Sequence, residues 1–338
     1  MMKKGNYDID IVMPWVDGND PEWQKEFNKY ALEKSRITDA NVDRYRDWDL
    51  LKYWFRGVEK FAPWVRTVHF VTSGQKPAWL NINAPKLHWV KHEDFIPKQF
   101  LPTFSARPIE LNFHRIEGLA EHFVYFNDDF FLINDTPRER FFRNGLPCDM
   151  AVCHQISPLN NVLAHTVVNN MCCINETFNK RQVIRKNWTK WFNPRYGAMQ
   201  ILTILSYPWS MFSYFYDFHL PYAYRKSIFE EVWNKYEDRL EKESMTRFRY
   251  ISNCNQSLMR SWQLVKGEFT PYNVCKDSIY FGINDSEINR IAQCIKGKKK
   301  NIVVLNDDEK NIKDFEFCQK SLIEAFEQIL PDKSSFEL

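Results

Sequence analysis

The chain has 338 residues and 44% of them are hydrophobic, so we expect a full core, and a globally disordered chain is excluded. The formal net charge is +3, which is too close to neutral to indicate a nucleic-acid partner. The eight cysteines include no C-x-x-C pair and the first residues show no apolar signal segment, so we expect free thiols in a reducing, cytoplasmic compartment.

The first half of the chain predicts strands that alternate with helices. Apolar runs predict strands over residues 9–16, 68–72 and 87–90, and a further strand that begins at Phe123. Helices are expected over residues 22–33, 47–61 and 109–119, and in the second of these the apolar side chains recur at spacings near three and four. This order favours a mixed or parallel α/β sheet.

Small and polar residues close the first two strands. Trp15, Asp17 and Gly18 lie at the end of the first strand, and Gly74 and Gln75 follow the second. In open α/β domains such loops bind nucleotides, and an indole ring can stack on a base. A plain surface loop is the alternative interpretation.

The strand that begins at Phe123 ends abruptly in Asn127, Asp128 and Asp129. Buried carboxylates are costly unless they are paired or bind a cation, so we expect this string at the edge of the sheet, where ligands bind. Asn and Asp also favour ordinary polar turns, and the stretch alone fits both interpretations.

The second half predicts mainly helices, over residues 176–192, 225–243, 255–264, 286–294 and 314–330. One strand, over residues 302–305, ends in Asn306-Asp307-Asp308 and so repeats the earlier pattern. Residues 196–216 contain no charged side chain, but Pro208 and several polar residues argue against a membrane-spanning helix. Two interpretations stay open for this segment, a buried aromatic core and a contact with the membrane interface.

Four groups of motifs resemble the conserved regions of the Stealth family. The string from Trp15 to Trp23 is similar to the first region, and residues 62–81 with 101–129 resemble the second. The third is resembled by His219-Leu220-Pro221 with Phe248-Arg249, and the fourth by Leu305-Asn306-Asp307 with the tail 330–337. Ser73 stands where the family more often has Asn, and Gly282-Ile283-Asn284-Asp285 only imitates the fourth region.

The resemblance implies a Rossmann-like mixed α/β sheet of the glycosyltransferase A type with helical additions. Residues 1–150 would form the nucleotide-sugar-binding α/β part, and residues 151–338 a mostly helical part that completes one catalytic unit. The implied reaction moves hexose 1-phosphate from a nucleotide sugar, with UDP-GlcNAc the first expectation, to a glycan hydroxyl in capsule or surface-polysaccharide synthesis. An ordinary glycosyltransferase that releases nucleoside diphosphate and an inactive glycan-binding member are the alternatives. A lipid-linked oligosaccharide acceptor would favour a peripheral location at the inner face of the membrane, through residues 196–216.

The resemblance and the residue chemistry together assign a metal site and a base. Asp128 and Asp129 suit a divalent cation, Mg²⁺ or Mn²⁺, because such ions are held by one or two carboxylates plus substrate phosphates. Asn306 and Asp307 would complete this site if their strand ends beside Asn127. Either Asp129 or His219 would take the proton of the acceptor hydroxyl.

Other residues would bind the donor or position the reacting groups. Arg249 suits bidentate contact with a phosphate. Glu110 is expected to position a neighbour, since it would share a helix face with His114. The nucleotide-sugar site would contain the residues at the strand ends and two basic side chains: Trp15, Asp17, Gly18, Arg46, Gly74, Gln75, Arg115 and Asn127.

Overall fold

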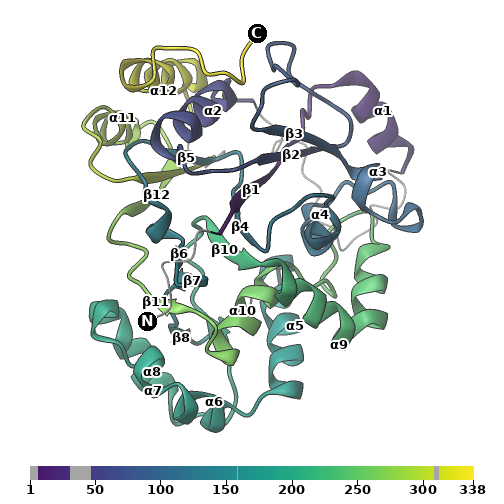
Figure 1. Cartoon of the computed structure of the whole chain (residues 1–338), viewed down its shortest axis with the longest axis vertical. Helices are drawn as coiled ribbons and strands as arrows, with labels where there is room; N and C mark the ends of the chain where they lie inside the picture. The colour runs from purple at the N-terminus through teal and green to yellow at the C-terminus, as the bar shows by residue number, and fades with distance from the viewer. Residues whose placement is uncertain (1–6, 31–46, 158, 308–311) are drawn as a thin grey trace.

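A computed structural model describes residues 7–30, 47–157, 159–307 and 312–338 as a mixed α/β protein (Figure 1). Its main sheet has five strands, and four of them, β1 to β4, are parallel to one another. The order across this sheet is β10 (Tyr222–Arg225), β4 (His122–Tyr125), β1 (Ile9–Pro14), β2 (Val68–Thr72) and β3 (Leu87–Lys91).

The strand order reverses beside β1. The chain runs from β1 outward to β2 and β3 and then returns to place β4 on the other side of β1. In open α/β sheets, such a reversal opens a crevice at the carboxyl ends of the two strands, and ligands bind there. β10, from the second half of the chain, closes the sheet by pairing antiparallel with β4.

The remaining strands form smaller sheets. β13 lies between β12, to which it is parallel, and β5, to which it is antiparallel. These strands are β5 (Phe130–Leu132), β6 (Phe142–Arg143), β7 (Leu146–Asp149), β8 (Cys153–His154), β9 (Tyr214–Phe215), β11 (Thr270–Pro271), β12 (Ser278–Ile283) and β13 (Ile302–Asp307).

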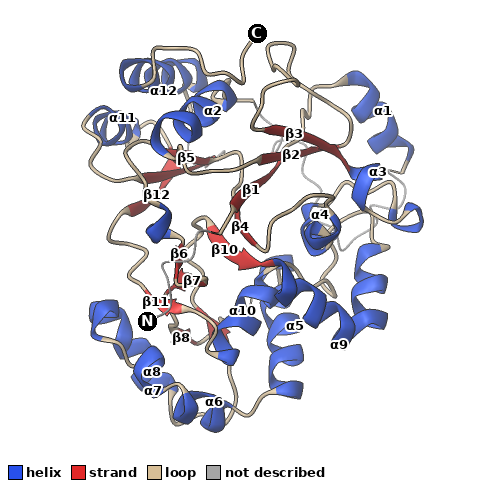
Figure 2. Ribbon diagram, in the orientation of Figure 1, coloured by secondary structure: helices blue, strands red, loops and turns tan. Residues whose placement is uncertain are grey.

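Helices cover the sheets on several sides (Figure 2). Figure 2 shows α2, α11 and α12 at one end of the molecule and α6, α7 and α8 at the opposite end. The helices are α1 (Pro21–Lys29), α2 (Leu51–Phe61), α3 (His92–Phe95), α4 (Ala106–Leu111), α5 (Val162–Thr177), α6 (Lys180–Lys186), α7 (Trp188–Trp191), α8 (Gln200–Ser206), α9 (Lys226–Ser244), α10 (Ser257–Lys266), α11 (Ile288–Lys296) and α12 (Phe315–Ile329).

Most predicted elements are confirmed, with shifted ends. The expected strand over 9–16 ends at Pro14, and the expected helix over 47–61 begins at Leu51. The helix predicted over 109–119 is wrong beyond Leu111, because a separate 3₁₀ turn, Phe113–Arg115, follows it and Gly118 takes a left-handed conformation with φ of 72°. The single helix predicted over 176–192 is likewise wrong, because α5 ends at Thr177 and α6 and α7 follow it.

The two halves expected from the sequence, residues 1–150 and 151–338, contribute strands to the same sheets. β10, β12 and β13 all come from residues after 151, and two of them pair with strands from residues before 151, β10 with β4 and β13 with β5. Besides its helices, the second half therefore contains strands of the five-stranded sheet and of the sheet formed by β12, β13 and β5. All eight cysteines are free thiols, as expected.

A buried carboxylate in β1 links this strand to β2 and to the segments that precede β2 and β4. Asp10, in β1, is fully buried and accepts hydrogen bonds from Arg66 (2.8 Å), from His69 Nε2 (3.0 Å) and from the backbone N–H of Ala120 (2.8 Å). His69 Nδ1 lies 2.9 Å from Nδ1 of His88, so a His88 N–H donates to His69 when the Nε2–H of His69 donates to Asp10. Burial would raise the pKa of Asp10, but the hydrogen bonds from His69, Arg66 and Ala120 outweigh it and lower that pKa.

We expect Asp10→Asn to lower the free energy of unfolding by about 2–3 kcal/mol, since hydrogen bonds to a charged group are lost. The folded-state pKa of Asp10 is depressed, so its contribution is fully present at neutral pH and disappears as the pH falls below about 4. Urea unfolding across this range measures both effects. Asp8→Asn is the matched control, because Asp8 is exposed and lies 3.9 Å from the same Arg66. An equal loss in both variants, or a loss that persists at low pH, contradicts the assignment.

Candidate active site

The carboxyl ends of β1, β2 and β4 meet at one edge of the main sheet. Since β1 is parallel to both neighbours, the loops that follow the three strands leave the sheet on the same side. Asp17 and Gln75 lie in the first two loops, and Asn127 opens the third. The backbone therefore brings the loops that contain Asp17, Gln75 and Asn127 to one edge of the sheet.

Asp129 lies between two segments that are distant in sequence. Its backbone carbonyl accepts a hydrogen bond from the N–H of Leu305 (2.9 Å), because β13 pairs with β5 directly after Asp129. This pairing brings Asn306 and Asp307, at the end of β13, beside the Asn127-Asp128-Asp129 turn. The strand that contains Asn306 and Asp307 therefore ends beside Asn127, which was the condition for these two residues to complete the site.

His219 approaches the same carboxylate from the loop before β10. Its Nε2 lies 3.6 Å from Oδ2 of Asp129. Burial favours the neutral imidazole, yet the nearby carboxylate of Asp129, with the charge of Asp217, raises the pKa of His219 above its ordinary value. His219 has φ of 48°, and Asp217 fixes this turn by accepting hydrogen bonds from the His219 N–H (2.8 Å) and from the hydroxyl of Tyr222 (2.5 Å).

The other oxygen of Asp129 has a different environment. Oδ1 is buried and forms no hydrogen bond with any residue that the structure describes. The neighbouring Asp128 side chain reaches solvent, but desolvation by the surrounding protein and the charge of Asp129 raise the pKa of Asp128. Two adjacent carboxylates with an unused oxygen suit a hard cation.

The fit of a divalent cation follows from these donors. Carboxylate and amide oxygens are the ligands that Mg²⁺ prefers, and Asp128, Asp129, Asn306 and Asp307 supply only such atoms. Within the described residues no three His, Cys, Asp or Glu side chains are close enough together to hold a metal ion. A cation at Asp129 would therefore need oxygens from a substrate as well, as Mg²⁺ often does.

Two residues that the sequence analysis did not single out also lie here. The indole N–H of Trp48 donates to Oδ2 of Asp307 (3.1 Å). Asp47 is close enough to Asp17 and Asp128 for their charges to interact, and desolvation followed by the charges of Asp49 and Asp17 raises the pKa of Asp47. The alternating Asp47-Trp48-Asp49 string directly before α2 was the available signal.

Gln75 joins the first two loops. Its side-chain carbonyl accepts from the N–H of Asp17 (3.1 Å), and its amide donates to the carbonyl of Asp17 (2.9 Å) and to Asp20 (3.0 Å). Gly74 precedes it with φ of 110°, a conformation that disfavours any side chain. Both residues thus shape the loop, and Trp15 packs beside Phe70 with ring centroids 5.6 Å apart. Gly18 contributes its carbonyl, which accepts from Gln24 (2.8 Å).

Glu110 and Arg249 lie near each other and near the last residue of β4. Glu110 is buried and accepts a hydrogen bond of 2.6 Å from the hydroxyl of Tyr125, the last residue of β4. Burial raises the pKa of Glu110, while Tyr125 and the charge of Arg249 oppose the shift. Phe248, next to Arg249, is buried in an aromatic cluster with Phe27 and Phe104, which holds the Arg249 loop against α1. Glu110 lies in α4, which ends at Leu111, and His114 lies in the separate 3₁₀ turn that follows. The prediction that the two residues share a helix face is therefore wrong.

Two predicted basic residues are not among these contacts. Arg115 donates to Asn112 (2.9 Å), and its guanidinium lies 4.7 Å from the ring centroid of Trp233 in α9. Its described contacts are therefore with the helical layer and not with the strand ends. Arg46 lies outside the residues that the structure describes.

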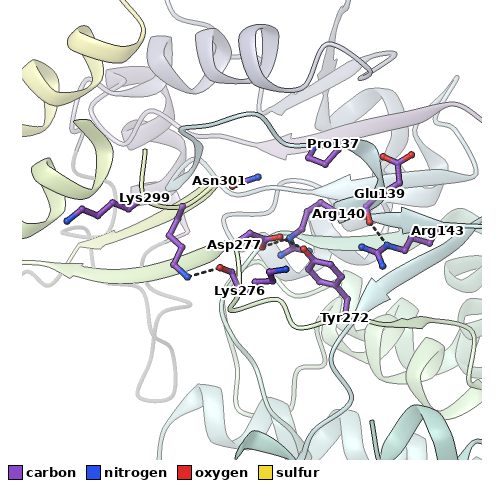
Figure 3. A pocket seen from close by; sticks show the side chains of 10 residues that line it. Pro137, Glu139, Arg140, Arg143, Tyr272, Lys276, Asp277, Lys299 and Asn301 are labelled. Carbon is purple, nitrogen blue, oxygen red and sulfur yellow. Dashed lines mark hydrogen bonds and ion pairs between the residues drawn. The ribbon is translucent and has the colours of Figure 1, made fainter. Parts of the chain in front are cut away.

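A basic hollow of about 330 Å³ occurs elsewhere (Figure 3). It is lined by Arg140, Arg143, Lys276 and Lys299, near the residues that precede β12 and β13. β13 is six residues long, so this hollow is about 15–20 Å from Asp307 at the other end of that strand. It is separate from the carboxylate site, and the chemistry of the strand ends does not involve it.

Comparisons with known proteins agree with this arrangement. Stealth protein conserved region 1 matches residues 7–35, and conserved region 2 matches residues 44–148. A capsular polysaccharide phosphotransferase, WcwK, of Streptococcus pneumoniae is 41% identical over 97% of this chain and 98% of its own length. An exopolysaccharide phosphotransferase, cps2G, of Lactiplantibacillus plantarum is 40% identical over 100% of this chain and 98% of its own length. A receptor polysaccharide phosphotransferase, WefC, of Streptococcus oralis is 40% identical over 98% of this chain and 99% of its own.

Among solved structures, the apo form of WbbM, a bifunctional glycosyltransferase, is similar with a TM-score of 0.38 and 9% identity, over 97% of this chain and 53% of that one. The sheet, its reversal point and the carboxylates at its edge define an α/β enzyme, and the full-length relatives make it a transferase. The chain belongs to the Stealth family.

Proposed function

We propose that the protein transfers a hexose 1-phosphate from a nucleotide sugar to a hydroxyl of a glycan, as a step in capsule or surface-polysaccharide synthesis. The acceptor oxygen forms a bond to the phosphorus that carries the sugar, and the bond from that phosphorus to the bridging oxygen breaks. A nucleoside monophosphate leaves, and the product is a phosphodiester. Relatives named as polysaccharide phosphotransferases, similar over nearly the whole chain, support this class of reaction.

One observation carries the proposal: the two oxygens of Asp129 have different surroundings. Oδ2 lies 3.6 Å from His219, while buried Oδ1 has no hydrogen-bond partner among the described residues. Phosphoryl transfer requires a positioned base and neutralised phosphate charge, and the two oxygens provide for both. We assign His219 as the base that accepts the acceptor proton, and Asp129 as the group that orients and stabilises the resulting imidazolium.

A divalent cation at Asp128 and Asp129, with Asn306 and Asp307 nearby, would neutralise charge on the donor phosphates. The chain itself contributes the arrangement of the donor site. Gln75, after β2, holds the loop that contains Asp17 and Gly18 through its hydrogen bonds with Asp17. Trp15, which packs beside Phe70 at the start of that loop, would contact the base of the nucleotide. We assign contact with a phosphate to Arg249, which follows buried Phe248 and is close enough to Glu110 for their charges to interact.

The donor in this proposal is a UDP-sugar, with UDP-GlcNAc the first to test, and the acceptor is a lipid-linked oligosaccharide at the cytoplasmic face of the membrane. With UDP-GlcNAc labelled on the phosphate next to the sugar, we expect the label in the glycan product and unlabelled UMP in solution. A panel of other nucleotide sugars, scored for monophosphate against diphosphate release, identifies the donor. Label retained in released UDP would show an ordinary glycosyltransferase. Glycan binding without turnover of any donor would show an inactive binding protein.

A further inference from the structure

The segment that contains α7 and α8 exposes an unusual number of apolar side chains. In α8, Ile201, Ile204 and Leu205 are 55%, 51% and 63% exposed. Their spacing of three and four places them on one face of the helix. The opposite face is polar and buried, since Thr203 accepts a hydrogen bond from the N–H of Cys153 (3.0 Å). The helix therefore presents its apolar side to solvent, which is the reverse of the usual arrangement.

Aromatic residues extend this face. Trp188 in α7 is 51% exposed, and its ring centroid lies 6.2 Å from that of Tyr207, directly after α8. Trp209 and Met211 are exposed in the loop that follows. Single exposed apolar residues are ordinary, but a group of this size on one corner of the molecule marks an interaction surface. We call it the α7–α8 face: Trp188, Ile201, Ile204, Leu205, Tyr207, Trp209 and Met211.

The segment that forms the α7–α8 face contains charged side chains of one sign only. Residues 177–216 contain no Asp or Glu, while they include Lys180, Arg181, Arg185, Lys186, Lys190 and Arg195. Arg181, Arg185, Lys186 and Arg195 are exposed. Lys180 and Lys190 donate hydrogen bonds to backbone carbonyls instead.

This charge pattern separates the possible occupants. A symmetric contact between two copies would place the same basic residues opposite one another, which is unfavourable. A bilayer with anionic lipids offers both complementary parts, since its headgroups attract Lys and Arg and its interface accepts Trp, Tyr and aliphatic side chains. We propose that the α7–α8 face docks on the surface of an anionic phospholipid membrane, with α8 in the plane of the interface.

The position of this face also suits a lipid-linked substrate. His219 is only eight positions after Met211, so the face and the proposed base are at most about 28 Å apart along the chain. β9, which lies between them, pairs with β8 and fixes this connection to the body of the protein. Among the described residues, the helices are all too short or too polar to span a bilayer. The use of docking for catalysis depends on the proposed function, whereas the docking itself does not.

Vesicle flotation with the purified full chain tests the proposal. We expect the wild type to float with phosphatidylglycerol-containing vesicles and much less with pure phosphatidylcholine vesicles. The variant I201S/I204S/L205S should lower the partition coefficient by about tenfold or more, because the apolar contact is lost. The variant R181Q/R185Q/K186Q, or added salt, should weaken binding only to the anionic vesicles.

Phe317→Ser is the matched control, since Phe317 is 47% exposed on α12 at the opposite end of the molecule (Figure 1). It should bind vesicles like the wild type, and thermal unfolding should show all variants folded. The proposal is overturned if the wild type binds neither vesicle or if the α8 variant floats unchanged. It is also overturned if light scattering finds a wild-type dimer that the α8 variant dissociates. Binding is scored without turnover, so normal docking with no transfer would reject the proposed function alone.

Discussion

Asp129→Asn is expected to lower kcat by about 10³-fold or more, since in the proposed reaction this one carboxylate serves both the base and the phosphate charge. Asn has the same shape, and the backbone hydrogen bond from Leu305 does not depend on the side chain, so the loop should keep its position. The charge beside His219 disappears, so the pKa of His219 should fall towards or below its ordinary value. Single-turnover assays measure the rate, and NMR titration of the imidazole measures the pKa.

Asp135→Asn is the control for this substitution. Asp135 is exposed and lies beyond the far end of β5, whereas Asp129 directly precedes that strand. Its replacement should leave kcat within about twofold, as for ordinary surface changes. Full turnover by Asp129→Asn in the presence of a chelator would show that neither the cation nor the charge is needed, and the proposed site would have to be abandoned.

His219→Gln should reduce kcat by about 10²–10⁴-fold, the usual contribution of a general base. The pH profile provides a second readout. Because the base must be neutral, wild-type kcat should rise with pH through a midpoint above the ordinary histidine pKa of about 6.5, since the pKa of His219 is raised. This rise should vanish in the variant, whose residual rate would be nearly independent of pH over the same range.

His165→Gln is the comparison, because His165 is a partly exposed residue of α5 and has no role in the proposed reaction. It should retain both the wild-type rate and the rise with pH. A His219 variant that loses rate but keeps the full pH-dependent limb would assign the base to another group, and Asp128 would be the next to test.

The parts of the site that the sequence predicts are those with a local signal. An apolar run that stops at Asn127 places the following carboxylates at a strand end, and this needs no knowledge of distant contacts. The partners of Asp129 are different, because they depend on two pairings, β5 with β13 and β4 with β10. The first was expected only as a condition, and β10 was not predicted, since Tyr222–Arg225 has four residues and lies between a Pro-containing turn and a long helix.

The helix errors also have a physical cause. Residues 109–119 have helical composition, but buried Asn112 donates to the carbonyl of Pro108 (2.8 Å) and to Ser244 (3.1 Å) at the end of α4. A side chain that competes for backbone groups favours the end of a helix, and tertiary packing against α9 decides where this occurs. For residues 196–216 the sequence left two interpretations. Tyr196, Phe212 and Phe215 are buried, as the first requires, while Ile201, Ile204 and Leu205 between them are exposed, and membrane contact stays a prediction.

The antiparallel pairing of β4 with β10 makes the intervening chain equivalent to a very long hairpin. Tyr125 and Tyr222 are opposite each other, so Asp129, four residues beyond the first, and His219, three residues before the second, meet at the end of the hairpin where the intervening chain begins and ends. The separation of the proposed base from its carboxylate is therefore set by strand register and not by the length of what lies between. A slip of one residue would reverse the faces of β10 and move His219 away from Asp129. Insertions or deletions within residues 155–210 could thus change the proposed contact with acceptor-bearing membranes while leaving His219 beside Asp129.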